Sequence, residues 1–192
     1  MRRFLLVAHD ARTSADFPLD DLPGAAGRMD LVARCVVASL LVSRGVRTDA
    51  EFLAVLLGPP RPPRIVRFVG AEVRSLNPDE RSTASLLRKA LAEEGLAERS
   101  MHPGVYGRGG GLRDALAAIP PPIFLMDEGG EDLRGKHMGS DVTFVLSDHR
   151  DFTAEERAWL AASTTAKLSV GPRALHADQV IAIVHNGLDR RA

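Results

Sequence analysis

The chain has 192 residues, of which 45% are hydrophobic, enough for one substantial domain or two very small ones. This apolar content excludes a chain that is disordered throughout. The 25 Lys and Arg residues are balanced by 25 Asp and Glu residues, which excludes a uniformly basic nucleic-acid-binding coat. Any contact with RNA or DNA therefore requires charges that are gathered on one face.

Arginine dominates the basic residues, with 22 Arg against three Lys. The planar guanidinium recognises phosphates, carboxylates and base edges with paired hydrogen bonds, which the Lys ammonium does not. A GC-rich genome also raises the Arg and Ala content together. The composition alone leaves both explanations open.

The single cysteine, Cys35, excludes an internal disulfide and a cysteine-rich metal site. No stretch approaches the roughly 18 consecutive apolar residues of a membrane span. The basic start is followed by only a short apolar run, at residues 4–8, which indicates a first strand rather than a signal peptide. We expect a soluble, cytoplasmic protein without a membrane partner.

In the first third of the chain, apolar runs of strand length alternate with helical spacing. Residues 4–8 predict a strand, and apolar residues at spacings of three and four predict a helix over residues 29–43. Strands are predicted over residues 52–57 and 65–69. The proline-rich turn at residues 58–63 separates them, so this pair can form a hairpin.

The middle of the chain predicts one helix and one irregular segment. The helix is expected to begin with Asn77 as its N-cap and to run to about residue 94. Residues 99–111 are polar and glycine-rich, and the glycine cluster at residues 107–111 predicts a flexible loop. The alternative is a mobile substrate loop in which Tyr106 and Arg108 stack on an exposed base.

The last third has the clearest alternation of strands and helices. Thr153 and Glu156 form a capping box, which predicts the start of a helix. The expected elements are a short helix over 112–119, strands over 123–126, 142–146 and 167–170, and helices over 153–162 and 175–188. This alternation favours a single α/β domain over residues 1–192 with a largely parallel sheet.

Common catalytic motifs are missing from the sequence. It has neither a phosphate-binding loop nor a dinucleotide-binding glycine motif, and no nucleophile elbow. His176 and His185 are nine residues apart and fall on opposite sides of one predicted helix, and the other histidines lie in separate segments. We therefore expect neither a metal site nor covalent catalysis.

Three polar segments follow predicted strands, at residues 127–130, 147–149 and 169–172. In open α/β sheets, ligands bind outside the carboxyl ends of the strands. These segments are therefore either the walls of a small-molecule pocket or ordinary turns between strands and helices.

A set of short segments occurs in order along nearly the whole chain. They are Asp21-Leu22-Pro23-Gly24-Ala25-Ala26-Gly27-Arg28-Met29-Asp30-Leu31, Arg67-Phe68-Val69-Gly70, Asn77-Pro78-Asp79-Glu80-Arg81, His102-Pro103-Gly104-Val105-Tyr106, Ser147-Asp148-His149, Leu168-Ser169-Val170-Gly171-Pro172 and Ile181-Ala182-Ile183-Val184-His185-Asn186. Together they resemble the TrmY family, which belongs to the SPOUT class of RNA methyltransferases. Archaeal members of the family are tRNA-modifying enzymes, and bacterial relatives look alike.

The resemblance implies a fold and an activity. The fold is a SPOUT-like parallel sheet with helices on both faces and a trefoil knot within about residues 120–192. The implied cofactor is S-adenosylmethionine, bound in the knot, and the implied assembly is a homodimer with the active site at its interface. The implied reaction is methylation of N1 of pseudouridine at position 54 of tRNA.

The resemblance also implies a set of cofactor-binding residues. They are Leu125, Ser147, Ser169, Gly171, Leu175 and Val180. Two positions depart from the family pattern. Ser147 stands where the family usually has Gly, and Asp178-Gln179-Val180 stands where it usually has Asn-His-Cys. Valine keeps the apolar packing of that Cys but not the polar contacts of a thiol.

Methylation of N1 requires removal of a proton from an imide-like N–H and a nucleophile held in line. Asp30 is the candidate for the first task, with Arg28 and Arg34 beside it. Asp30 and Arg34 share one face of the predicted helix, so the alternative is an ordinary ion pair within that helix.

The candidate RNA-binding residues are Arg81, Tyr106 and Arg108. Two other functions remain open at this point. One is a methyltransferase of the same fold with a different RNA target, and the other is an RNA-binding dimer without catalytic activity. Under any of the three, the arginines of the first two-thirds of the chain are expected to form the face that binds RNA.

Overall fold

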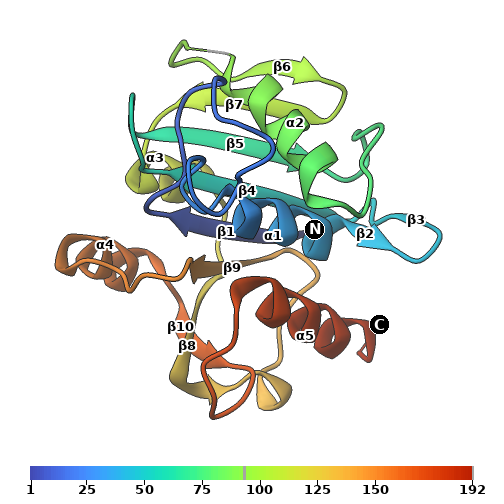
Figure 1. The fold of residues 1–192 in the computed structure, drawn as a ribbon. Coiled ribbons are helices and arrows are strands. Elements are labelled where there is room, and N and C mark those ends of the chain that lie inside the picture. The colour runs from blue at the N-terminus through green and yellow to red at the C-terminus, as the bar shows by residue number, and fades with distance from the viewer. Residues whose placement is uncertain (93, 192) are drawn as a thin grey trace.

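The computed structural model describes residues 1–92 and 94–191. Within these residues, one eight-stranded mixed sheet in the order β10-β8-β9-β1-β4-β5-β7-β6 carries helices on both faces (Figure 1). The strands of the sheet are β1 Arg2–Ala8, β4 Ala50–Leu56, β5 Arg64–Val69, β6 Arg99–His102, β7 Val105–Gly109, β8 Ile123–Asp132, β9 Val142–Ser147 and β10 Ala166–Ser169. The helices are α1 Met29–Leu40, α2 Glu80–Leu91, α3 Leu112–Ala118, α4 Ala154–Ser163 and α5 Ala177–Asp189. A small hairpin, β2 Leu41–Val42 and β3 Gly45–Val46, follows α1, and a 3-10 turn, η1 Leu133–Gly135, follows β8.

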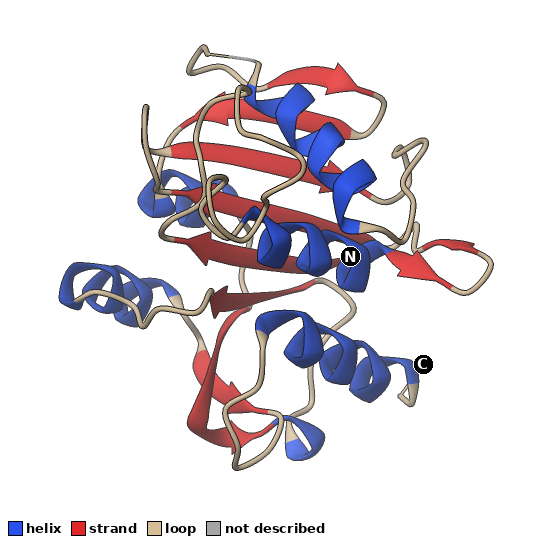
Figure 2. Cartoon of the chain, in the orientation of Figure 1, coloured by secondary structure: helices blue, strands red, loops and turns tan. Residues whose placement is uncertain are grey.

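The sheet is parallel on one side and antiparallel on the other, so the expected largely parallel sheet is only half right. β10, β8, β9, β1 and β4 run parallel, whereas β5, β7 and β6 are added in antiparallel pairs. The predicted β4–β5 hairpin is confirmed, with Phe52 opposite Phe68. Both faces are covered by helices, as expected (Figure 2).

Residues 99–109 form a hairpin of two strands. Tyr106, Gly107, Arg108 and Gly109 lie within β7, so the predictions of a flexible loop and of a mobile substrate loop are wrong for these residues. β7 pairs along β5, and β6 pairs along β7. A Cβ atom on Gly107 would lie 1.9 Å from the backbone oxygen of Ala90. Glycine is used here because α2 packs directly against the strand, and the turn-like composition therefore reflects close approach rather than flexibility.

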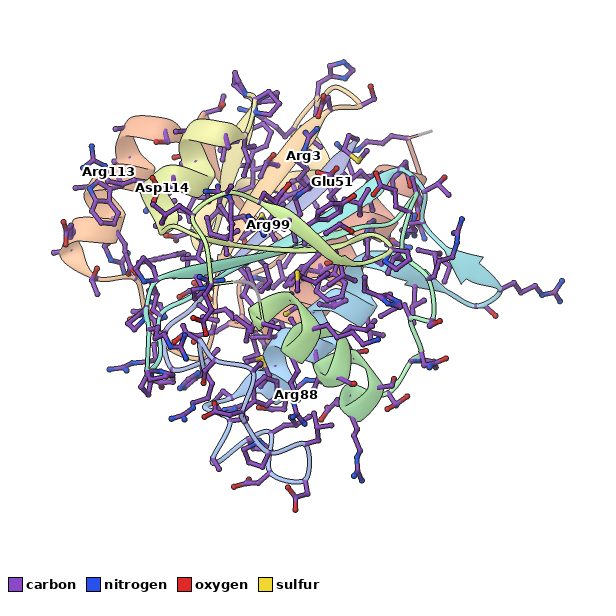
Figure 3. All side chains as sticks on the ribbon, turned by 90° about the horizontal axis from the view of Figure 1, so that it is seen from above. Arg3, Glu51, Arg88, Arg99, Arg113 and Asp114 are labelled. Carbon is purple, nitrogen blue, oxygen red and sulfur yellow. The ribbon has the colours of Figure 1, made fainter. Side chains whose placement is uncertain are left out.

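Alternation along the strands builds two cores, one on each face of the sheet. Phe4, Phe52, Phe68 and Phe144 are fully buried beneath α1, α2 and α5. The alternate positions of the same strands pack against α3 and α4. Figure 3 shows this separation, with Arg113 and Asp114 of α3 on one side of the sheet and Arg88 of α2 on the other. Burial on both faces explains why these strands are apolar at nearly every position.

Several predicted boundaries shift for local reasons. α2 is capped by Asp79, whose carboxylate accepts a hydrogen bond from the Ser82 N–H at 2.8 Å, and not by Asn77. The helix ends at Leu91, before its predicted end, and residue 93 lies outside the described residues. α5 begins after His176. The predicted Thr153 capping box of α4 is confirmed.

β8 is longer than predicted, because the polar residues 127–130 continue the strand to Asp132. The pairing register between β10 and β8 shifts between Lys167 and Leu168. A Cβ atom on Gly130 would lie 2.7 Å from the Leu168 backbone, so only glycine allows the two chains to approach here.

His185 ties α5 to α1 and to the start of β1. Its Nε2 donates a hydrogen bond to the Ser39 backbone oxygen at 2.9 Å, and its Nδ1 lies 3.4 Å from the Arg2 guanidinium. Asp189 accepts hydrogen bonds from both Arg2 and Arg47. Burial, together with the nearby positive charges of Arg47 and Arg2, lowers the pKa of His185 to about 4. The ring is therefore neutral in the folded protein near pH 7.

We expect this histidine to destabilise the fold in acid. In the unfolded chain, His185 is protonated with the ordinary pKa of 6.5, whereas in the folded protein its pKa is about 4. The free energy of unfolding should therefore fall by up to about 3 kcal/mol more in the wild type than in His185→Gln between these pH values. Urea unfolding across this range measures the difference, and identical pH slopes for the two proteins would contradict it.

Candidate active site

The parallel strands place the carboxyl ends of β1, β8, β9 and β10 at one edge of the sheet, and a cavity of about 680 Å³ opens there. Its walls are the loop after β9, the loop between β10 and α5, and residues 126–128 of β8. The volume is typical of sites for small-molecule ligands. The structure thus brings together the three polar segments that the sequence places after strands.

Most of the predicted cofactor-binding residues line this cavity. Its lining includes Ser147, Ser169, Gly171, Leu175 and Val180. The exception is Leu125, which is 5% exposed and packs in the core beneath α3 and α4. Its side chain points to the opposite face from its neighbours because the strand alternates.

The cavity combines an apolar floor with a charged rim. Leu31, Leu146 and Leu168 contribute apolar side chains, while Asp127 and Arg157 contribute opposite charges. Asp127 accepts hydrogen bonds from the Lys167 ammonium at 3.0 Å and from the Gly129 N–H at 2.9 Å, and both lower its pKa. Its carboxylate is therefore charged near pH 7.

Two serines shape the turns that border the cavity. The hydroxyl of Ser147 donates a hydrogen bond to the backbone oxygen of Arg150 and so closes the first turn after β9. The hydroxyl of Ser169 donates to the Gly171 oxygen at 2.7 Å and accepts from the Gly171 N–H at 3.1 Å. Gly171 has a φ of 155°, a conformation that favours glycine.

Asp30, Arg28 and Arg34 form one ion-paired cluster beside the cavity. The Arg28 guanidinium donates to both carboxylate oxygens of Asp30, at 3.0 and 3.2 Å, and Arg34 donates to one of them at 2.8 Å. Asp30 is only 4% exposed. Burial opposes its ionisation, but the hydrogen bonds from Arg28 and Arg34 prevail and lower its pKa. The Asp30–Arg34 ion pair considered as the alternative is thus present, with Arg28 as a second partner.

The backbone that carries this cluster is locally strained. Gly27 and Arg28 both have a positive φ, 65° and 66°, and Arg28 is the residue before the first turn of α1. A Cβ atom on Gly27 would lie 1.9 Å from the Asp10 backbone oxygen. Strain of this kind persists where the surroundings fix it, and it is frequent at functional sites.

Arg34 connects the cluster to the last helix. Its guanidinium lies 3.2 Å from Glu80 of α2 and 3.8 Å from Asp178 of α5. Asp178 immediately precedes Gln179 and Val180, which line the cavity, and Leu31 of α1 lines it too. The Asp30 cluster and the cavity are therefore neighbours.

The candidate RNA-binding residues lie apart from the cavity. Arg81 is exposed in the first turn of α2. The Arg67 guanidinium lies over the ring of Tyr106 of β7, 4.4 Å from the centre of that ring. The Tyr106 hydroxyl donates a hydrogen bond to Glu72. Arg108 lines a second groove of about 670 Å³ on the α3 side of the sheet.

This second groove is lined in part by paired charges. Arg3 of β1 and Glu51 of β4 line it and are labelled in Figure 3, and the Arg3 Nε atom lies 3.2 Å from Glu51. Arg67 also pairs with Glu98, at 2.7 Å. Arg3 and Arg67 are thus paired with acidic side chains within the protein.

Sequence reasoning missed one buried cluster at the cavity edge. The His9 ring lies between Asp148, at 2.8 Å, and Glu156, at 3.1 Å. The available signal was that His9 directly follows β1, as Asp148 follows β9. The contact spans 139 residues, so only the sheet order reveals it.

The described residues contain neither a membrane-spanning helix nor a metal-binding cluster. None of their helices is long and apolar enough to cross a membrane. Among residues 1–92 and 94–191, no group of three or more His, Cys, Asp or Glu side chains is arranged to hold a metal ion.

Comparison with known proteins gives full-length matches. Residues 1–192 match the family described as "Putative SAM-dependent RNA methyltransferase". A tRNA (pseudouridine(54)-N(1))-methyltransferase from Methanocella arvoryzae is 47% identical over 195 residues, which cover 100% of both chains. The enzyme of the same name from Halobacterium salinarum is 44% identical, covering 98% of this chain and 96% of the other.

The fold matches a solved structure as well. A crystal structure of Archaeoglobus fulgidus Nep1 bound to S-adenosylhomocysteine superposes with a TM-score of 0.65 and 17% sequence identity, covering 98% of this chain and 97% of that one. At this identity the likeness concerns the fold alone. From its full-length sequence matches, the chain belongs to the family of tRNA (pseudouridine(54)-N(1))-methyltransferases, the TrmY family that its motifs resemble.

Proposed function

We propose that this protein transfers a methyl group from S-adenosylmethionine to N1 of pseudouridine 54 in tRNA. The observation that carries this proposal is the placement of the Asp30 cluster beside a cavity of about 680 Å³ at the carboxyl edge of the sheet. Relatives with this activity cover the whole chain, which supports the same reaction here.

The residues of the cavity fit the cofactor. Its apolar floor, with Leu31, Leu146 and Leu168, suits the adenine, and Val180 keeps that character. The Asp127 carboxylate suits a cationic group or ribose hydroxyls, and the Arg157 guanidinium suits the carboxylate of the methionine part. We assign the cofactor-binding role to this lining, with Met126 and Asp127 in place of Leu125.

When bound, S-adenosylmethionine supplies a methyl group that is activated by a sulfonium. The protein's part is to hold the pseudouridine in line with that methyl group and to accept the N1 proton. Asp30 is the candidate acceptor, because its carboxylate is charged and lies beside the cavity. Arg28 and Arg34 hold that carboxylate in place and limit its basicity, so orientation is the larger contribution.

Two finer features of the family belong to this proposal. The first is the trefoil knot within about residues 120–192. In support, β10 pairs with β8 at one end of the sheet whereas α5 packs on α1, so the chain returns across the sheet between them. The second is a homodimer that completes the active site. The exposed side chain of Ile183 on α5 supports an interface there.

The tRNA face is proposed to include Arg81 and Arg108, which are the less heavily paired of the candidate residues. Arg81 is exposed on α2. Arg108 makes only hydrogen bonds to backbone oxygens, at 3.3 and 3.5 Å, among the contacts of the described residues. Tyr106 is the weaker candidate, because Arg67 and Glu72 already engage it.

Transfer to matched RNA stem-loops tests the function directly. A stem-loop that carries pseudouridine at the position of residue 54 should accept label from methyl-labelled S-adenosylmethionine, and the same stem-loop with uridine should not, because uridine presents no N–H at the equivalent position. Equal labelling of the two RNAs would refute specificity for pseudouridine.

Asp30 can be tested apart from cofactor binding. Asp30→Ala should reduce the rate of transfer by about 100-fold or more, as expected for loss of a positioned proton acceptor. By calorimetry, the Asp30→Ala variant should bind S-adenosylhomocysteine with the same affinity as the wild type, because Asp30 does not line the cavity. Loss of that affinity together with activity would show that Asp30 has only a structural role.

A further inference from the structure

His9 lies between two carboxylates at the edge of the sheet where the cavity opens. Its Nδ1 is 2.8 Å from Asp148 and its Nε2 is 3.1 Å from Glu156, and its backbone N–H donates to Asp148 at 2.7 Å. The three side chains are 9%, 2% and 7% exposed, respectively. The mechanism proposed above assigns no role to this buried cluster.

Both contacts of the ring are satisfied together when it is an imidazolium. A neutral imidazole has one donor and one acceptor nitrogen, whereas both nitrogens of His9 face carboxylate oxygens, which accept hydrogen bonds when ionised. Each carboxylate also accepts from a backbone N–H, that of Arg150 at 2.9 Å for Asp148 and that of Thr153 at 2.8 Å for Glu156. These bonds favour ionised carboxylates and therefore a doubly protonated ring.

The pKa values follow the same pattern. The hydrogen bond to Asp148 raises the pKa of His9, burial opposes this, and Glu156 raises it further, so that the balance lies above the usual value. Burial opposes ionisation of Asp148 and Glu156, but the hydrogen bonds that they accept lower the pKa of both.

Other charged groups surround the cluster without entering it. His149 lies 3.6 Å from Asp148 and 3.1 Å from Asp10, and the Arg150 guanidinium lies 2.8 Å from Asp10. From the α1 side, the positive charge of Arg28 acts on Asp148. None of these surrounding groups lies between the carboxylates of Asp148 and Glu156, as His9 does.

We propose that His9 is a positioning residue of the cofactor cavity: its charged ring bridges Asp148, in the cavity wall, to Glu156, in the first turn of α4. This wall is the loop of residues 147–153, of which residues 147–152 line the cavity. Without the charged ring, two buried carboxylates would lack the cation that separates them, and the wall would shift. The proposal rests on the proposed function, because it takes the cavity to bind S-adenosylmethionine.

The bridge has a defined pH dependence. The pKa of His9 is raised in the folded protein above the ordinary imidazole pKa of 6.5. The bridge is therefore complete below pH 6.5 and is lost as the pH rises through the raised pKa of His9. Cofactor affinity should therefore weaken toward alkaline pH. Removal of the N1 proton becomes easier in that direction, so binding without RNA is the measurement that isolates His9.

Calorimetry with S-adenosylhomocysteine from about pH 6 to about pH 9 is the test. In the wild type, the dissociation constant should rise by about tenfold over this range, as for loss of one charge-assisted contact. His9→Gln, which does not titrate, should bind with the weak alkaline affinity at every pH.

Two control variants remove other imidazoles. His137→Gln changes an exposed residue away from the cavity and should keep the wild-type profile. His149→Gln changes the other imidazole of the wall and should keep the pH dependence even if the affinity changes. His185 does not interfere, because its pKa is about 4.

A second variant covers the case in which His9→Gln does not fold. Glu156→Gln keeps an oxygen for the capping box but removes one negative charge, so the pKa of His9, followed by NMR of its ring protons, should fall. The pH at which affinity weakens should fall with it.

Three outcomes overturn the proposal. One is a folded His9→Gln protein with the wild-type pH profile, and another is a lowered pKa of His9 in Glu156→Gln without a shift in the affinity profile. Both leave the proposed function intact. The third is absence of binding by the wild type at every pH, which would refute the assigned cofactor site itself.

Discussion

The parallel pairing of β1 with β9 joins the two halves of the chain, and the site depends on it. Residues 2–7 pair in register with residues 142–147, so both strands end at the same edge of the sheet. The loop after β1 leads into α1 with the Asp30 cluster, and the loop after β9 forms a wall of the cavity. Hydrogen bonds from His9 to Asp148 close the junction. The Asp30 cluster and the cavity meet only because these two strands are neighbours.

Much of the fold follows from periodicity and capping. The apolar spacing of α1, the β4–β5 hairpin around its proline-rich turn, and the Thr153 capping box are all readable in the sequence. Glycine is the residue that misleads. Gly107 and Gly130 suggest loops, yet they lie within strands where a neighbouring backbone leaves no room for a Cβ atom. A single sequence does not distinguish a glycine needed for a turn from one needed for close packing.

The site is only partly predictable, for a related reason. Ser147, Ser169 and Gly171 follow strands and are identifiable as cavity residues from local order alone. The side chain of Leu125 packs in the core, because strand alternation decides which side chain faces the cavity. Many arginines hold acidic side chains in place through ion pairs within the protein, as Arg28 and Arg34 do with Asp30. The zero net charge of the chain gives no sign of these contacts.

We infer that the cavity and the Asp30 cluster together carry out the methylation of N1 of pseudouridine in tRNA. Mass spectrometry of tRNA nucleosides from a strain that lacks the gene tests it most directly. We expect N1-methylpseudouridine to disappear from tRNA in this strain. The wild-type gene should restore it, whereas the Asp30→Ala gene should not. Persistence of the methylated nucleoside in the deletion strain would contradict this assignment.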